Sequence, residues 1–281
     1  MPSTLFIVAT PIGNLEDITL RALRVLREVS LIAAEDTRRT AKLLSHFDIS
    51  TPTTSFFEHN EHEKEPRLIA RLAAGEDIAL VSDAGTPGIS DPGYRLVTAA
   101  LEAGVRVEAI PGASAVLTAL VASGLPTHAC LFAGFPPARS QARDRWLSSL
   151  GERPESLVFF EAPHRLRQTL EAALRILGDR PAAVCRELTK VHEEFVRGPL
   201  SAVLEKLGEP RGEFTVILAP AAATPEGPVQ LPDDQRLLDE FYQLTETEGL
   251  NRRDALSRLA SRYGKPSREL YAAIERAKRQ G

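Results

Sequence analysis

Short apolar runs alternate with helix-like segments through the first 122 residues of the chain. Leu20, Leu23, Leu26 and Val29 recur at helical spacing, so residues 17–30 are predicted to form an amphipathic helix. Apolar runs with the length of buried strands occur at residues 5–9, 31–34, 78–81 and 105–110, and further elements are predicted at 40–46, 53–57 and after Asn60. Because strands alternate with helices, the pattern predicts a mainly parallel sheet flanked by helices.

A second alternating region follows a pause at residues 123–127, with the sequence SGLPT. Strands are predicted at residues 130–133, 157–161, 182–187, 194–197 and 214–218. The third and fourth of these are separated only by a short polar segment, which favours an antiparallel pair. The chain is therefore predicted to be an α/β protein with two α/β domains, residues 1–122 and 128–220.

The C-terminal part is predicted to be helical and basic. Residues 220–232 are rich in Ala, Pro and Gly and are typical of a linker. Helices are predicted at residues 233–246, 251–260 and 268–279, so residues 233–281 form a small all-α extension that resembles a helix-turn-helix. From Leu250 onward there are nine Lys or Arg and three Asp or Glu, a local charge of +6 in a chain whose net charge is −4. The remaining residues then carry −10, and a basic extension on an acidic body suggests a polyanionic partner.

The composition limits the class of protein. The chain has 281 residues, 43% of them hydrophobic, with no apolar run of membrane-spanning length and no signal-peptide pattern. We therefore expect a cytoplasmic protein that is not inserted in a membrane. Cys130 and Cys185 are too few for a disulfide framework or a four-ligand zinc site, and both are interpreted as reduced core residues. His59 and His62 lack a third ligand at suitable spacing, so no metal is expected.

A glycine-rich loop follows the predicted strand at residues 78–81. In the sequence SDAGTPGISDPG, residues 82–93, Gly85, Gly88 and Gly93 permit positive φ or close approach of a ligand. Asp91 and Pro92 are predicted to start the next helix as N-cap and first-turn proline. Loops of similar composition follow the strands at 5–9 and 105–110, and open α/β sheets bind ligands at that edge. The alternative is a structural turn before a helix.

The chemistry of the loop narrows the choice of ligand. Asp83 disfavours a bare phosphate, and neither a P-loop nor the Gly-x-Gly-x-x-Gly dinucleotide pattern is present. A ligand with a cationic centre, a free amine and hydroxyl groups would suit the loop. S-adenosylmethionine is one such candidate among several.

Six longer motifs resemble a known family. They are TPIGNLEDIT at residues 10–19, EDTR at 35–38, SFFEHN at 55–60, SDAGTPGISDPG at 82–93, PGASA at 111–115 and FEAPHR at 160–165. They closely resemble the ribosomal RNA small subunit methyltransferase I family of the tetrapyrrole methylase superfamily, and the resemblance continues into the tail. It implies S-adenosylmethionine in a cleft between two α/β domains, a homodimer, and 2′-O-methylation of a decoding-region cytidine of 16S ribosomal RNA, position 1402 in the usual rRNA numbering.

The resemblance implies a set of cofactor-binding residues. Ser114 is equally suited to cap a helix, and Ile89 taken alone would pass as a packing residue. The set consists of Thr10, Asp83, Ala84, Gly85, Thr86, Ile89, Ser114, Ala115, Phe160 and Glu213.

The reaction would also need a group that takes the proton of the ribose hydroxyl, together with cations near phosphate or alkoxide. The proton acceptor is left open among Glu35, Asp36, His59, Glu161 and Glu187, with Glu35, Asp36, His59 and the cation Arg38 forming the predicted catalytic group. Predicted contacts to the RNA of the small ribosomal subunit are Arg165, Arg186, Lys190, Arg252, Arg253 and Arg258. Helix capping by Glu35 and Asp36, a solvated loop around His59 and a helix start at Arg165 are the structural alternatives.

Two other functions are compatible with parts of this pattern. A methyltransferase for a small molecule of the tetrapyrrole type would use the glycine-rich loop but leave the basic tail without a purpose. A non-catalytic RNA-binding module would use the tail but not the loop. Only RNA 2′-O-methylation accounts for both features.

Overall fold

The computed structural model describes residues 3–57, 59–90, 93–221, 232–247, 250–263 and 265–280, and its first five strands form one parallel sheet. The strand order is β3-β2-β4-β1-β5, with every neighbouring pair parallel. These strands are β1 (Thr4–Val8), β2 (Leu31–Ala34), β3 (Thr53–Ser55), β4 (Ile78–Val81) and β5 (Arg106–Ile110). The carboxyl ends of all five strands therefore lie at one edge of the sheet.

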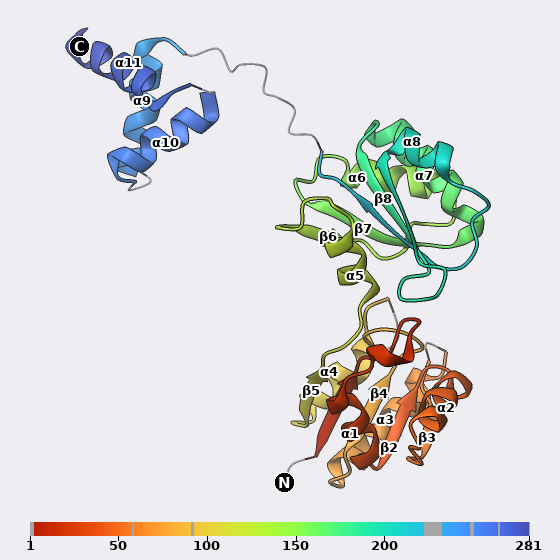
Figure 1. Cartoon of the computed structure of the whole chain (residues 1–281). Helices are drawn as coiled ribbons and strands as arrows, with labels where there is room; N and C mark the ends of the chain where they lie inside the picture. The colour runs from red at the N-terminus through yellow and green to blue at the C-terminus, as the bar shows by residue number, and fades with distance from the viewer. Residues whose placement is uncertain are drawn as a thin grey trace. The chain divides into compact units, whose positions relative to one another are not determined.

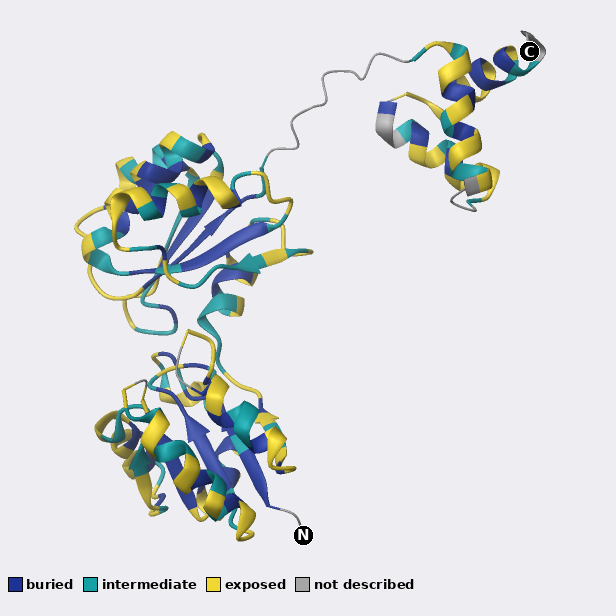
Figure 2. Cartoon of the chain, turned by 180° about the vertical axis from the view of Figure 1, so that it is seen from behind, coloured by how far each residue is buried: buried dark blue, intermediate teal, exposed yellow. Residues whose placement is uncertain are grey.

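Helices cover both faces of this sheet because its inner strands are apolar on both sides. Leu31 and Ala33 pack in a cluster with side chains of α3 (Glu61–Ala73) and α4 (Tyr94–Glu102). The alternate residues Ile32 and Ala34 pack in another cluster with side chains of α1 (Leu20–Glu28) and α2 (Thr37–His46). Figure 2 shows these strands as a buried layer between partly exposed helices.

The second sheet is mixed and has the order β6-β7-β10-β8-β9. Strand β6 runs parallel to β7, and the other neighbouring pairs are antiparallel. The strands are β6 (Cys130–Phe132), β7 (Ser156–Glu161), β8 (Pro181–Arg186), β9 (Glu194–Pro199) and β10 (Phe214–Leu218). The antiparallel pairing predicted from the short connection between β8 and β9 is therefore observed.

One face of the second sheet is covered by three helices, α6 (Ser140–Leu150), α7 (Pro163–Leu177) and α8 (Leu200–Lys206). Helix α7 begins with Pro163 in its first turn, and its buried residues recur at helical spacing. The other face meets α5 (Ala115–Ala122), the helix that connects the two sheets, through Ala119 and Leu120. Figure 1 shows α5 between the two sheets.

Backbone contacts divide the chain into two compact units, Met1–Ala221 with both sheets and Ala222–Gly281 with the C-terminal helices. The second unit contains α9 (Asp234–Tyr242), a π-helical turn (Gln243–Thr247), α10 (Arg252–Tyr263) and α11 (Ser267–Gln280) around a core of its own. The predicted border between two domains at 123–127 stays a prediction, although it coincides with the change from the first sheet to the second.

Several expectations need adjustment. The helix predicted at 17–30 is shorter, because a 3₁₀ turn (Leu15–Asp17) precedes it and the Thr19 hydroxyl accepts the Ala22 N–H at 3.1 Å as an N-cap. Cys130 is exposed on the edge strand β6, so its interpretation as a core residue is wrong, whereas Cys185 is buried and burial raises the pKa of its thiol to about 12. The cap predicted at Asp91 and Pro92 and most of the predicted linker lie outside the described residues. Among the described helices, none has the length and apolarity to cross a membrane.

Candidate active site

The glycine-rich loops after β1 and β4 are hydrogen-bonded to each other. The Thr10 N–H donates to the Gly85 carbonyl at 2.9 Å, and the Gly85 N–H donates to the Thr10 carbonyl at 3.0 Å. The Thr10 hydroxyl also donates to the Ser82 carbonyl at 3.2 Å, and Thr10 is buried. Gly85 has φ +83°, a left-handed conformation that favours glycine, so the backbone bridge requires this residue type.

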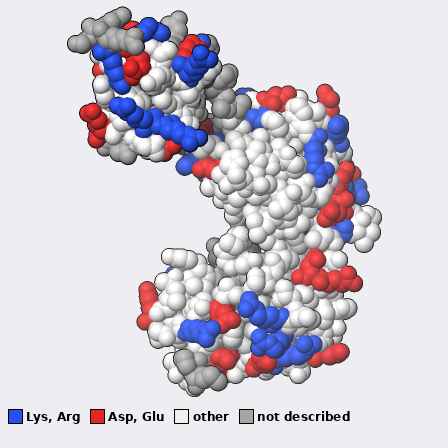
Figure 3. Space-filling model, turned by 60° about the vertical axis from the view of Figure 1, so that its left-hand side comes forward, with Lys and Arg blue, Asp and Glu red and all other residues white. Residues whose placement is uncertain are grey.

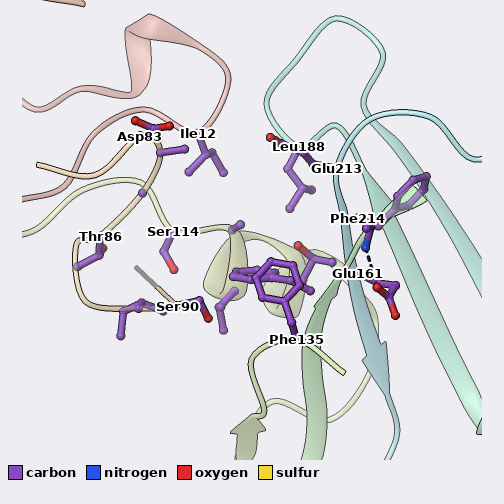
Figure 4. A pocket seen from close by; sticks show the side chains of 18 of the residues that line it. Ile12, Asp83, Thr86, Ser90, Ser114, Phe135, Glu161, Leu188, Glu213 and Phe214 are labelled. Atoms are coloured by element: carbon purple, nitrogen blue, oxygen red, sulfur yellow. Dashed lines mark hydrogen bonds between the residues drawn. The ribbon is translucent and has the colours of Figure 1, made fainter. Parts of the chain in front are cut away.

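A cavity of about 410 Å³ lies between these loops and the second sheet (Figure 4). Figure 4 shows Asp83, Thr86 and Ser114 on loops of the first sheet, with Phe135, Leu188 and Glu213 contributed by the second. The lining residues are Ile12, Glu35, Arg39, Asp83, Ala84, Gly85, Thr86, Ile89, Ser90, Ser114, Ala115, Val116, Phe135, Phe160, Glu161, Ala162, Pro163, Leu188, Gly212, Glu213, Phe214 and Thr215.

Two carboxylates and an arginine meet on the first-sheet wall of the cavity. Glu35 follows β2 and Asp83 follows β4, and these two strands are neighbours. The Asp83 N–H donates to Glu35 Oε2 at 3.2 Å, and Arg39 Nη1 lies 3.4 Å from Asp83 Oδ2. Burial raises the pKa of Glu35, although the Asp83 N–H and the Arg39 cation partly oppose that effect. The wall therefore combines one carboxylate paired with a cation and one half-buried carboxylate.

Asp36 lies next to Glu35 in the chain but has a different role in the structure. Its carboxylate accepts the Arg38 N–H at 2.8 Å as the N-cap of α2 and pairs with Arg38 Nη2 at 2.9 Å. These hydrogen bonds from Arg38 lower the pKa of Asp36 to about 2. Its own backbone N–H donates to Asp83 Oδ1 at 3.0 Å, which ties the start of α2 to the glycine-rich loop.

The opposite wall contains a buried carboxylate with a full set of donors. Glu161 is 2% exposed, and its Oε1 accepts the Ala162 N–H at 2.8 Å and lies 2.8 Å from Arg165 Nη2. Its Oε2 accepts the Thr169 hydroxyl at 2.6 Å. Since Arg165 and Thr169 belong to α7, these bonds hold the first turns of that helix against the end of β7.

A third group of charges lies next to Leu188 and includes the cavity residue Glu213. Lys190 Nζ lies 3.1 Å from Glu187 Oε1 and 3.0 Å from Glu213 Oε2. The Thr189 hydroxyl accepts the Asn14 N–H at 3.1 Å, which links this loop of the second sheet to the loop after β1. A Cβ at Gly13 would lie 2.5 Å from Lys190 Cγ, so the close approach requires glycine.

Comparison with known proteins identifies the family. A model of the tetrapyrrole (corrin/porphyrin) methylases matches residues 4–204. The chain is 47% identical over 270 residues to "Ribosomal RNA small subunit methyltransferase I" of Synechocystis sp., covering 95% of each chain. A protein of the same name from Halalkalibacterium halodurans is 46% identical over 276 residues, covering 95% of this chain and 93% of the other. The chain belongs to the tetrapyrrole methylase family, in its ribosomal RNA small subunit methyltransferase I branch.

A solved structure of another methyltransferase shares the fold. It is uroporphyrin-III C-methyl transferase from Thermus thermophilus complexed with S-adenyl homocysteine, with a TM-score of 0.54 and 24% identity. The match covers 77% of this chain and 97% of that chain. The predicted α/β fold of the tetrapyrrole methylase type is thus confirmed.

The cavity of this tetrapyrrole methylase brings together nine of the ten residues predicted to bind a cofactor. Thr10 does not line it but braces Gly85 through the backbone bridge. Of the predicted catalytic group, Glu35 lines the cavity, whereas Asp36, Arg38 and His59 do not.

The predicted RNA contacts of the first unit lie outside the cavity lining. Arg165 is turned inward to Glu161, and Lys190 bridges Glu187 and Glu213. Arg186 Nε donates to the Arg211 carbonyl at 2.8 Å. Their roles toward RNA stay predictions.

Sequence reasoning missed Arg39, Phe135 and Leu188 in the cavity. Arg39 follows Arg38 directly, and only the rotation of α2 decides which of the two faces Asp83. Phe135 comes from the segment after β6, which carries no chemical pattern. Leu188 lies between Glu187 and Thr189, two non-glycine residues with positive φ, +50° and +64°. Such strained positions cluster at functional sites but are not visible in a sequence.

The hydrogen bond between Thr169 and Glu161 can be tested by removing its donor. We expect Thr169→Val to lower the free energy of unfolding by about 1.5–3 kcal/mol, because a buried carboxylate loses a donor while the volume is kept. Urea denaturation measures the change. Thr98→Val is the matched control, because the Thr98 hydroxyl donates only to the Tyr94 carbonyl within α4. Equal effects of the two substitutions would contradict the assigned role.

Proposed function

We propose that this chain transfers a methyl group from S-adenosylmethionine to the 2′-hydroxyl of a decoding-region cytidine, position 1402, of 16S ribosomal RNA. The alignment with the Synechocystis protein carries the proposal, because it spans 270 residues while the first compact unit has only 221. The similarity must therefore extend into the C-terminal helices, beyond the end of the match to the family model at residue 204. An rRNA substrate is consistent with a cytoplasmic location, which stays a prediction.

The side chains around the cavity suit S-adenosylmethionine. Asp83 supplies negative charge for a ligand with a sulfonium and an ammonium group. Phe135 and Phe160, whose ring centroids are 5.4 Å apart, supply aromatic surface for an adenine ring. Ser114 caps α5 at the cavity, and a helix N-terminus favours a carboxylate. The sulfonium, ammonium, adenine and carboxylate parts of the ligand thus each have a chemically suitable neighbour in the lining.

When bound, S-adenosylmethionine supplies an already activated methyl group, so the main task of the protein is orientation. Bringing two reactants into alignment can supply about 7–11 kcal/mol of the barrier reduction. The Thr10–Gly85 bridge and the Glu161–Arg165–Thr169 cluster keep the two walls of the cavity rigid. Rigid walls of this kind can hold the ligand in one orientation without first having to order the side chains and loops that contact it.

The proposed reaction predicts one missing ribose methyl group in the cell. We expect 16S ribosomal RNA from cells that lack this protein to lose a single 2′-O-methyl mark at the decoding-region cytidine, and the intact gene to restore it. Mass spectrometry of RNase digests measures the mark. An unchanged set of ribose methyl groups would contradict the RNA substrate, and loss of a tetrapyrrole methylation instead would favour the small-molecule alternative.

The C-terminal unit is proposed to contact RNA through a local surface rather than through its total charge. The unit Ala222–Gly281 contains ten Lys or Arg and ten Asp or Glu, so its net charge is zero. The excess of +6 counted from Leu250 belongs to α10, α11 and their connections, whereas α9 is acidic, and Asp234 of α9 pairs with Arg276 of α11 at 2.8 Å. Figure 3 shows basic side chains gathered in a band across one face of this unit.

Salt dependence of RNA binding tests that surface. Arg252, Arg253 and Arg258 are exposed on α10, and we expect their joint replacement by Gln to weaken RNA binding and to reduce the slope of log K against log salt by about 2–3. Fluorescence anisotropy with a decoding-region RNA at several salt concentrations measures the slope. Replacement of Arg24, Arg67 and Arg145, which are exposed on helices of the first unit, serves as the matched control. A slope equal to that of the control would rule out the α10 contact.

We also propose that the protein is a homodimer that uses α5. This helix has the sequence AVLTALVA, with Thr118 as its one polar residue; Ala119 and Leu120 are buried in the core, and Ala115 and Val116 pack against it. Leu117 and Val121, one turn apart on the opposite side, are 60% and 74% exposed. Exposed apolar side chains at i and i+4 are suited to a second copy of the same helix.

Charged substitutions on α5 test the dimer. We expect the double variant Leu117→Glu and Val121→Glu to be monomeric in light scattering at micromolar concentration, because two carboxylates would be placed in the interface. Leu20→Glu, at an 87% exposed position on α1, should leave the mass unchanged. A wild-type protein that is already monomeric would contradict the dimer, and an unaltered dimer in the double variant would exclude α5 from the interface.

A further inference from the structure

We infer that Glu35 is the group that accepts the proton of the ribose hydroxyl, an inference that rests on the proposed RNA 2′-O-methylation. Two carboxylates of the cavity lining, Asp83 and Glu213, are each paired with a cation, Arg39 and Lys190 respectively. The sequence offers five further candidates, namely Glu35, Asp36, His59, Glu161 and Glu187, of which only Glu35 and Glu161 line the cavity. The choice therefore depends on which of these two carboxylates has an oxygen available to a ligand.

Glu161 is excluded by its surroundings. Its side chain has no exposed surface, one oxygen serves both Arg165 and the Ala162 N–H, and the other accepts the Thr169 hydroxyl. A hydroxyl group of a substrate could reach Glu161 only by displacing one of these donors. Removal of a donor leaves the buried charge of the carboxylate uncompensated, which destabilises the folded protein. Glu161 is thus a positioning residue for α7.

The remaining candidates are unsuited by charge or by location. Arg38 holds Asp36 at a pKa of about 2, so Asp36 is a weak base. Burial alone would raise the pKa of Glu187, but the Glu213 N–H and Lys190 outweigh it and lower that pKa. His59 is exposed on the loop after β3 and does not line the cavity. None of the three combines access to the cavity with basicity.

Glu35 combines both properties. It lines the cavity, it is half-buried, and Oε2 is the one oxygen that accepts a described hydrogen bond, from the Asp83 N–H at 3.2 Å. That bond orients the side chain and leaves Oε1 for a ligand. Burial has the largest effect on Glu35 and raises its pKa from the ordinary value. Of the charged groups that face it, Asp83 and Asp36 also raise the pKa, and Arg39 lowers it. A base is more effective when its pKa lies closer to the working pH.

The proposed step is balanced in atoms and charge. The ribose oxygen gains the methyl carbon as the bond from that carbon to sulfur breaks, and the electron pair of that bond stays on sulfur. The proton of the hydroxyl passes to Glu35, so the positive charge of the sulfonium is compensated by neutralisation of the carboxylate. Glu35 then releases the proton to solvent. Arg39 Nη1 lies 3.4 Å from Asp83 Oδ2, so of these two neighbouring carboxylates Glu35 is the one without a described ion pair.

The test separates proton transfer from cofactor binding. Glu35→Gln keeps the size of the side chain and an acceptor for the Asp83 N–H but removes the base. We expect the single-turnover rate of ribose methylation, measured on small subunits from cells lacking the protein, to fall about 100-fold or more. The affinity for S-adenosylmethionine, measured by calorimetry, should change less than about threefold. A loss of affinity of about tenfold or more, with the rate at saturation kept, would overturn the inference and make Glu35 a cofactor ligand.

The pH profile and a conservative variant complete the test. The wild-type rate should fall as pH decreases through the pKa of Glu35, because the protonated carboxyl cannot accept another proton, and this limb should be absent in Glu35→Gln. Glu35→Asp keeps a carboxylate on a shorter side chain, so it should retain the fall in rate at low pH and have an intermediate rate. This variant also keeps the inference testable if Glu35→Gln fails to fold. A rate for Glu35→Asp no higher than that of Glu35→Gln would overturn the inference.

Glu76→Gln is the control for the amide substitution. Glu76 pairs with Arg71 at 2.9 Å outside the cavity, and its replacement should leave rate and pH profile unchanged. If wild-type protein methylates no ribose, the proposed function fails together with the inference. If the wild type is active and Glu35→Gln is equally active, the inference alone fails.

Discussion

The pair of backbone hydrogen bonds between Thr10 and Gly85 is the constraint on which the candidate active-site cavity depends. It joins the loops that leave β1 and β4, two neighbouring parallel strands whose carboxyl ends meet at one edge of the sheet. The bridge forms because Gly85 adopts a left-handed conformation that a residue with a Cβ would adopt only with strain. Once the two loops are joined, Asp83 is directed toward Glu35 and Arg39, and the first wall of the cavity is complete.

The carboxylates around this cavity illustrate how environment divides one chemical group among several tasks. Glu161 is buried and saturated with donors, so it supports the start of α7. Asp36 is held ionised by Arg38 and caps α2. Asp83 is paired with Arg39, whereas Glu35 is half-buried with an oxygen that accepts no described hydrogen bond, and it forms no described ion pair. Desolvation favours the neutral form of an acid, whereas nearby cations and N–H donors favour the charged form, and the balance differs at each position.

The electrostatics of the C-terminal unit depend on where the folded unit begins. Counted from Leu250, the tail is strongly basic, but the compact unit also includes the acidic helix α9 and is neutral. Attraction to RNA must then come from the arrangement of charges on its surface, since a neutral body has no long-range net attraction for a polyanion. A local band of basic side chains acts within about one Debye length, roughly 8 Å at physiological salt.

The sequence alone was sufficient to predict the strands, the parallel first sheet, the antiparallel pair in the second and the glycine-rich edge, because these depend on local patterns of apolar residues and on glycine. The runs at 31–34, 78–81 and 214–218 match β2, β4 and β10 without adjustment.

Tertiary structure decided which polar side chains face the cavity. Neighbours such as Glu35 and Asp36, or Arg38 and Arg39, point in different directions once α2 begins, and Arg165 turns inward because Glu161 is buried beside it. The exposure of Cys130 was likewise decided by the position of β6 at the sheet edge, since a short apolar run looks the same in a central strand and in an edge strand.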